Sequence, residues 1–398
     1  MADTQHKQDS NGPSLVGLVV AFLAGVALVT GLLVTMPKPG ASGSAQGGSA
    51  QQAASPTTTT ETVSNEIATH FASWNPNSPA LAELVTFVQS VCDPSSPNYR
   101  EPADRIATFD MDGTIIAEKA PMYLDYMLLI HRVLDDPQHK AEPDVVELME
   151  KVRAEAMKGK KNSEYSPGKH IAIAHEFAGM TPDEFRAYVR NFIENTPVVG
   201  FDGMTYEQSL YKPMLEVISY LQNNGFDVWM VSACEREVTR AVVQGLGIRP
   251  DHVVATDVAY TTTGMGDEAF DDHTMAQDEK VVLGEPLDEH ECGKTGKVLA
   301  IAREIGSKPV LAFGNSSGDY AMLNYAEQNG GMGLLVIADD EVRDYGSVSK
   351  SQEQYDLVAK ESWTAFSMAN DWTTIYGPDV KKTSLPGLAA ETQLAQAA

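Results

Sequence analysis

Two aspartates separated by one residue, Asp110 and Asp112, follow a short apolar run and precede Gly113 and Thr114. The run, residues 106–109, lacks polar alternation and ends at a turn former, which predicts a buried parallel strand. Open α/β sheets hold their ligands at the carboxyl ends of such strands. Two carboxylates this close repel each other unless a cation lies between them, so we expect a hard ion such as Mg²⁺ here. An acidic turn is the alternative interpretation of the same residues.

Polar groups at two later strand ends and one helix start could join this pair. Ser232 ends an apolar strand at residues 226–232, Asn315 and Asp319 follow another apolar run, and Lys297 opens a helix. Their types suit phosphoryl transfer: one carboxylate attacks phosphorus and a second moves the leaving-group proton. A hydroxyl and an ammonium can hold the phosphoryl oxygens, and further oxygen ligands can complete a Mg²⁺ shell.

The elements that must position these groups alternate between strands and helices. Helical spacing over residues 79–91 precedes the first strand, and residues 120–200 read as helical throughout. Thr181, Pro182 and Glu184 form a typical helix start. After this helical block the alternation resumes with helix 213–224. This alternation predicts an α/β fold with a doubly wound parallel sheet, into which the helical block is inserted as a cap. The remaining expected elements are strand 226–232, helix 235–246, strand 253–255, a hairpin-like region, helix 297–305, strand 309–313 and strand 333–337.

The domain boundaries follow from changes in composition. The expected segments are a polar N-terminus at 1–14, an apolar span at 15–36, a flexible linker at 37–64, a core α/β domain at 65–114 and 213–377, a helical cap at 115–212, and a disordered tail at 378–398.

The span from Leu15 to Met36 carries no charge and is long enough to cross a bilayer. We expect a transmembrane anchor with the catalytic domain outside the cytoplasm. A signal peptide cleaved near Gly43 or Ala45 would instead give a secreted protein, and a buried core helix is the third alternative.

Composition narrows the class of partner. The 398-residue chain has a formal net charge of −26, which argues against nucleic acid and anionic membrane surfaces as partners, because both attract basic patches. A hydrophobic share of 43% can bury a real core. The three cysteines, Cys92, Cys234 and Cys292, lack metal-binding spacing, and their disulfide state and the oligomeric state are left open.

Taken together, four stretches resemble the motifs of the haloacid dehalogenase superfamily. They are Phe109-Asp110-Met111-Asp112-Gly113-Thr114, Val231-Ser232-Ala233, Lys297, and Gly314-Asn315-Ser316-Ser317-Gly318-Asp319. The resemblance covers roughly residues 80–375 and is nearest the phosphoserine phosphatase and phosphorylcholine phosphatase branches. It implies a core with a first-position (C1) helical cap. It also implies phosphatase rather than dehalogenase chemistry, because true dehalogenases lack the second aspartate.

The resemblance assigns roles to these residues. Asp110 is the expected nucleophile and a metal ligand, and Asp112 is the expected acid/base and offers its backbone carbonyl to Mg²⁺. Ser232 and Thr114 are expected to bind the substrate phosphoryl group, and Asp319 is expected to bind the metal. Asn315 stands where many members have another aspartate, so it can coordinate the metal through its amide oxygen or through water.

Either Lys294 or Lys297 could be the lysine that binds phosphate. Lys297 matches the family spacing because it opens the helix leading into the strand at 309–313, so we favour Lys297 and read Lys294 as surface charge.

The predicted function is hydrolysis of a small organic phosphate with Mg²⁺ through an aspartyl-phosphate intermediate. Glu118, just after the first motif, is a candidate contact for a substrate amine such as that of phosphocholine, phosphoethanolamine or phosphoserine, with Tyr123 and Tyr126 offering ring faces. The alternative for Glu118 is a surface pair with Lys119 or with a lysine of the cap. The alternative functions are a phosphotransferase or mutase on the same site, and a non-catalytic cell-envelope binding protein.

Overall fold

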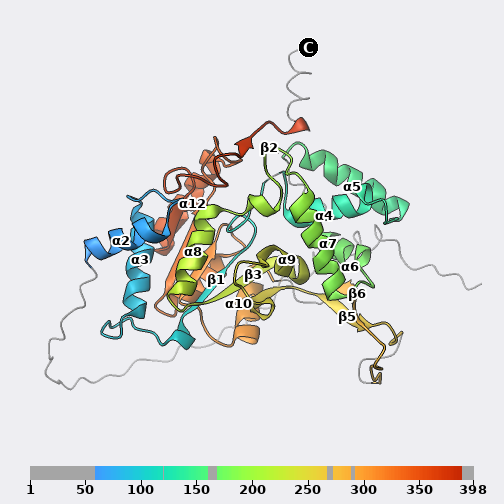
Figure 1. Cartoon of the computed structure of the whole chain (residues 1–398), viewed down its shortest axis with the longest axis horizontal. Helices are drawn as coiled ribbons and strands as arrows, with labels where there is room; N and C mark the ends of the chain where they lie inside the picture. Colours follow the sequence, from blue (N-terminus) through green and yellow to red (C-terminus); the bar gives the residue numbers. More distant parts are fainter. Residues whose placement is uncertain (1–58, 120, 160–167, 267–271, 288–291, 388–398) are drawn as a thin grey trace, which may run out of the picture.

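The computed structural model describes residues 59–387 except 120, 160–167, 267–271 and 288–291 (Figure 1). The apolar span at 15–36 and most of the predicted linker lie outside these residues. Within the described part of the chain, no helix is both long enough and apolar enough to cross a membrane.

A six-stranded parallel sheet forms the centre of the molecule, in the order β4-β3-β1-β7-β8-β9. From β1 the chain adds β3 and β4 on one side and then β7, β8 and β9 on the other. The strand order therefore reverses between β1 and β7. This topology confirms the predicted doubly wound sheet, although the edge strand β9 was not anticipated. The strands are β1 Ile106–Phe109, β3 Asp227–Glu235, β4 Val253–Thr256, β7 Leu311–Gly314, β8 Met332–Ile337 and β9 Thr364–Ser367.

Helices cover both faces of this sheet because alternate strand residues point to opposite sides. Phe109, Phe313 and Phe366 pack on the face covered by α3 and α8, and the first two rings stack at a centroid distance of 4.2 Å. Ala312 and Leu335 pack on the opposite face, under α10, α11 and α12. The helices are α3 Pro79–Cys92, α8 Lys212–Asn223, α10 Thr295–Ala300, α11 Tyr320–Glu327 and α12 Val348–Glu361.

The chain between β1 and β3 builds a separate group of helices. These helices gather on the side of the molecule away from α2, α3 and α8 (Figure 1). Thr181 and Glu184 cap α7 reciprocally, with Thr181 N donating to Glu184 Oε2 at 2.8 Å and Glu184 N to Thr181 Oγ1 at 3.2 Å. The sequence signal for this helix start is therefore confirmed. The helices are α4 Leu124–Ile130, α5 Pro143–Ala156, α6 Gly168–Glu176 and α7 Pro182–Asn195.

A β-hairpin reaches from the core to these helices. Its strands are β5 Val258–Thr262 and β6 Val281–Leu287, in the hairpin-like region of the sequence. Backbone bonds of 2.8 Å from Gly179 N to Leu283 O and from Leu283 N to Met180 O attach the turn before α7 to β6. Helix α9, Arg236–Val243, packs against α7. Helices α4 to α7, called the cap from here on, are thus attached to the core through backbone as well as side chains.

Two predicted flexible segments are ordered in part. Helix α2, Thr60–His70, begins inside the linker expected at 37–64, because Thr59 caps it by accepting from Thr62 N. The prediction of a disordered tail at 378–398 is wrong for residues 378–387, and residues 388–398 lie outside the described part of the chain. There, β10 Lys381–Lys382 pairs with β2 Phe201–Asp202 and the side chain of Leu385 is buried.

Several short helical turns complete the described fold. They are the 3₁₀ turns Pro102–Asp104, Glu207–Ser209 and Pro250–His252 and the π-helical turns His131–Asp135 and Ile301–Ile305.

Candidate active site

Asp110, Lys297 and Asp319 meet at the point where the strand order of the sheet reverses. Phe109 of β1 pairs with Phe313 of β7, and Asp110 N donates to Phe313 O at 2.9 Å. Asp110 therefore lies beside the loop that begins at Gly314. Open α/β sheets bind their ligands at this kind of switch point, outside the carboxyl ends of the strands.

Lys297 joins the two sides of this site. Its Nζ donates to Asp110 Oδ1 at 2.6 Å and to Asp319 Oδ1 at 2.7 Å, and its side chain is buried. Burial lowers the pKa of the Lys297 ammonium, but the carboxylates of Asp110 and Asp319 raise the pKa by more, so the lysine stays charged. Lys294 is exposed and contacts the loop through its backbone, with N donating to Gly318 O at 2.9 Å.

Asp110 is buried and held on both carboxylate oxygens. Thr114 Oγ1 donates to Asp110 Oδ2 at 3.2 Å, opposite the bond from Lys297. Burial first and the charge of Asp319 second raise the pKa of Asp110 to about 7, against the lowering effect of Lys297. A divalent cation beside the two carboxylates would favour the ionised form of Asp110.

The loop after β7 is folded by the other oxygen of Asp319. Its Oδ2 accepts from Asn315 N and from Ser316 N, both at 3.0 Å. A Cβ at position 314 would lie 2.3 Å from the Cβ of Asp319, so this position suits glycine. The sequence Gly-Asn-Ser-Ser-Gly-Asp therefore makes a closed loop that presents Asp319 Oδ1 to Lys297.

Gly113 gives the first loop its close approach to this second loop. It has φ of +79°, which favours glycine, and a Cβ there would lie 1.8 Å from Asn315 Nδ2 and 3.0 Å from Glu118 Oε2. Asn315 Nδ2 in turn donates to Glu118 Oε2 at 3.0 Å. The structure thus directs Glu118 toward the site.

Asp112 and Ser232 lie at the same edge of the sheet. Asp112 is half-buried and is close enough to Tyr123, together with Glu118 and Asp110, to raise the pKa of that phenol, which burial raises most. Ser232 is buried on β3, and its Oγ accepts from Cys234 N at 3.1 Å. Within the described chain, the structure does not bring Ser232 into hydrogen-bond contact with Asp110 or Lys297.

Behind Glu118 lie three buried side chains, Tyr211, Tyr376 and Asp344, that the sequence did not predict. The buried rings of Tyr211 and Tyr376 lie side by side with centroids 5.7 Å apart, and burial first and nearby carboxylates including Glu118 raise the pKa of the Tyr211 phenol. Tyr376 donates to Asp344 Oδ2 at 3.1 Å. These residues carry no motif and lie far apart in the chain, so the sequence offered no signal for them.

The oxygen donors at this edge of the sheet suit a hard cation such as Mg²⁺ better than they suit zinc. Among the described residues, no group of three or more His, Cys, Asp or Glu side chains is arranged to hold a metal ion. Asp110 and Asp319 supply two carboxylates, so any further oxygens would come from the Asp112 carbonyl and the Asn315 amide. Carboxylate, carbonyl and amide oxygens are ligands that Mg²⁺ accepts.

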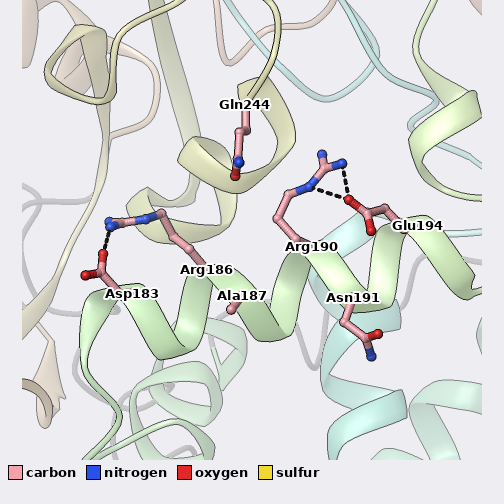
Figure 2. A pocket seen from close by; sticks show the side chains of 7 residues that line it. All are labelled: Asp183, Arg186, Ala187, Arg190, Asn191, Glu194 and Gln244. Carbon is pink, nitrogen blue, oxygen red and sulfur yellow. Dashed lines mark hydrogen bonds and ion pairs between the residues drawn. The ribbon is translucent and has the colours of Figure 1, made fainter.

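A groove between α7 and the end of α9 is lined by none of these residues (Figure 2). It is lined by Asp183, Arg186, Ala187, Arg190, Asn191, Glu194 and Gln244. Both arginines are already paired with carboxylates: Arg186 with Asp183 and Glu237, and Arg190 with Glu194 and Glu207. The groove therefore offers no free cationic pair for a phosphate and is not the candidate active site.

A family model described as haloacid dehalogenase-like hydrolase matches residues 107–324, which contain all of the candidate catalytic residues. The chain belongs to this family, as its four motifs predicted. In a sequence search, no curated protein matches the chain.

Among the solved structures to which the chain is similar are the following three. A protein of unknown function from Bordetella pertussis Tohama I has 16% identity, covering 66% of this chain and 97% of that chain, with a TM-score of 0.43. A phosphoserine phosphohydrolase-like protein from Francisella tularensis has 18% identity, 60% and 89% coverage, and a TM-score of 0.33. Cytosolic 5'-nucleotidase IIIB bound to cytidine has 12% identity, 80% and 94% coverage, and a TM-score of 0.42. At these values the likenesses carry no argument about the substrate.

Proposed function

We propose that the protein is a Mg²⁺-dependent phosphomonoesterase that hydrolyses a small organic phosphate through an aspartyl-phosphate on Asp110. The observation that carries the proposal is the buried contact of Lys297 with both Asp110 and Asp319 at the switch point of the sheet. A buried lysine between two carboxylates provides a fixed positive charge where a phosphoryl group must be bound.

Asp110 supports the first step as nucleophile. A carboxylate oxygen attacks phosphorus, and the bond from phosphorus to the substrate oxygen breaks, which leaves the phosphoryl group on Asp110. One oxygen accepts from Lys297 and the other from Thr114, and an ionised carboxylate has about four lone-pair sites. A lone pair therefore stays available for attack while the side chain is held.

Asp112 supports both proton transfers. In its acid form it protonates the departing substrate oxygen, and the carboxylate formed then takes a proton from the water that attacks the aspartyl-phosphate. This second step releases inorganic phosphate and restores Asp110. The separation of one residue places Asp112 next to the nucleophile but on a different part of the loop.

Asp110 and Asp319, with the Asp112 carbonyl and the Asn315 amide, would hold Mg²⁺. The ion would supply charge stabilisation to the phosphoryl oxygens. Lys297 holds Asp110 and Asp319 in place on the protein side of this shell.

Glu118 supports a substrate that bears an amine. Its carboxylate is half-buried at the site and lies near Tyr123, whose ring stacks with that of Tyr126 at a centroid distance of 6.4 Å and an angle of 24°. A carboxylate beside aromatic faces suits an ammonium or quaternary ammonium group. We infer that phosphocholine, phosphoethanolamine or phosphoserine is preferred over sugar phosphates.

Hydrolysis of para-nitrophenyl phosphate with and without Mg²⁺ tests the activity, and a panel of phosphomonoesters tests the substrate class. We expect Mg²⁺-dependent release of phosphate and a higher kcat/KM for amine-bearing esters. Binding of phosphate esters without release of phosphate would instead indicate a binding protein. Transfer of the phosphoryl group to an added alcohol in place of water would indicate a phosphotransferase.

A further inference from the structure

Glu118 is bound by a residue that is distant in sequence, and two tyrosines lie beside it. Asn315, 197 residues away, donates its side-chain amide to Glu118 Oε2. Tyr123, at the start of α4, and Tyr211 lie close enough to Glu118 for its charge to raise the pKa of each phenol, in addition to burial, which raises both most. The carboxylate thus lies between the loop after β7 and the start of the first cap helix.

The identity of residue 315 decides whether this contact can form. The amide of Asn315 is a neutral donor, and Gly113 leaves the space in which amide and carboxylate meet. An aspartate of the same size would place a second negative oxygen about 3 Å from Glu118, in a site that already contains Asp110 and Asp319. Like charges at this separation repel strongly where water is excluded.

The geometry points to Asn315 as a positioning residue that fixes the carboxylate of Glu118 beside the phosphoryl site. Its amide is required because a carboxylate at position 315 would drive Glu118 away. The consequence for substrate choice rests on the function proposed above, in which Glu118 contacts an amine. The contact itself does not depend on that function.

A stability cycle tests the contact without substrate or metal. We compare the thermal unfolding of the full-length protein, Asn315→Asp, Glu118→Gln and the double variant, all in EDTA. Asn315→Asp should lower Tm by at least about 3 °C. Adding Glu118→Gln should recover at least half of that loss, because the new amide at position 118 can donate to the new carboxylate at position 315, with the polarity of the bond reversed.

The inference is overturned if Glu118→Gln changes Tm by the same amount in the wild-type protein and in the Asn315→Asp variant. Such additivity would mean that the two side chains do not act on each other.

A specificity ratio tests the positioning role. We compare KM for phosphoethanolamine with KM for para-nitrophenyl phosphate, which has no amine, so a general loss of function cancels. Asn315→Asp should raise this ratio about tenfold. Gln354→Ala is the matched control, because Gln354 Nε2 donates to the backbone oxygen of Asn315 at 2.7 Å and not to its side chain. We expect the control to leave the ratio unchanged.

The two experiments separate the failure of the inference from the failure of the proposed function. A wild-type protein that does not prefer amine esters refutes the proposed substrate class, while the stability cycle still decides whether Asn315 holds Glu118. An unchanged ratio in Asn315→Asp, with a wild-type preference for amines, refutes the positioning role.

Discussion

Asp110 is buried, carries a raised pKa and bonds a buried lysine. We predict that Asp110→Asn lowers phosphatase activity by at least about 1,000-fold, because an amide cannot attack phosphorus. The fold should remain, since the Asn oxygen can still accept from Lys297. Assays with para-nitrophenyl phosphate and thermal unfolding of the purified variant measure the two effects. Appreciable hydrolysis by a well-folded Asp110→Asn protein would remove Asp110 from the nucleophile role.

Glu235 is a second buried carboxyl, at the end of β3. Its Oε2 accepts from Val238 N at 2.8 Å and caps α9, whereas Oε1 has no hydrogen-bond partner among the described residues. Burial raises its pKa to about 8, although backbone hydrogen bonds oppose the shift. The folded protein therefore favours the protonated acid, and ionisation of Glu235 costs stability.

This shift predicts a pH dependence of stability with a definite sign. The stabilising contribution of protonated Glu235 is complete below about pH 4.5 and is lost as the pH rises through about 8. Glu235→Gln mimics the protonated acid and keeps an oxygen to cap α9. We expect its free energy of unfolding, relative to wild type, to increase between about pH 5 and pH 8 and to level off above that in denaturant titrations. A difference that is constant over this range would contradict the raised pKa.

At the scale of elements, helix α7 of the cap meets helix α9 of the core through one buried carboxylate. Glu237 of α9 is fully buried and pairs with Arg186 of α7 and with Arg240. Tyr260 of the hairpin also donates to Glu237 Oε1 at 2.8 Å. Figure 2 shows the Arg186 side chain extending from α7 toward Asp183. Cap, hairpin and core therefore converge on Glu237.

We predict that Arg186→Gln lowers the free energy of unfolding by about 1 to 2 kcal/mol, because it leaves a buried carboxylate with fewer partners. Arg249→Gln is the control, since Arg249 pairs with Asp251 and both side chains are more than half exposed. Its effect should stay within about 0.5 kcal/mol. Urea unfolding of both variants measures the difference, and equal effects would show that the Arg186 contact does not stabilise the docked cap.

For the whole molecule, the described fold begins at Thr59, beyond the apolar span at 15–36. We predict that the full-length protein fractionates with membranes and that a chain beginning at Thr59 does not, yet keeps its Tm and activity. A chain beginning at Phe71 should be less stable, because it lacks α2 and its buried Ile67. Recovery of the full-length protein in the soluble fraction would refute the anchor and favour a cleaved signal. Protease added to intact cells reports the side on which the catalytic domain lies.

The sequence by itself determined the alternation of strands and helices, the doubly wound sheet, the family, and the strand-end residues Asp110, Ser232, Asn315 and Asp319. These features are local: apolar runs, capping residues and short motifs act over a few neighbouring residues. Parallel pairing then brings the carboxyl ends of strands to one edge by geometry alone. The preference for Lys297 over Lys294 followed from the motif spacing of the resembling family, and the structure places Lys297 against both carboxylates.

Only the tertiary structure decided which distant side chains meet. The contact of Asn315 with Glu118, the buried group of Tyr211, Tyr376 and Asp344 and the convergence on Glu237 join residues from separate elements, and no periodicity encodes such pairs. Strand β9 and the ordered segment at 378–387 were also missed. Each is short, and it is stabilised by a partner already in place: β8 for β9, and β2 for β10. Short segments of this kind gain their order from packing and pairing rather than from their own propensity.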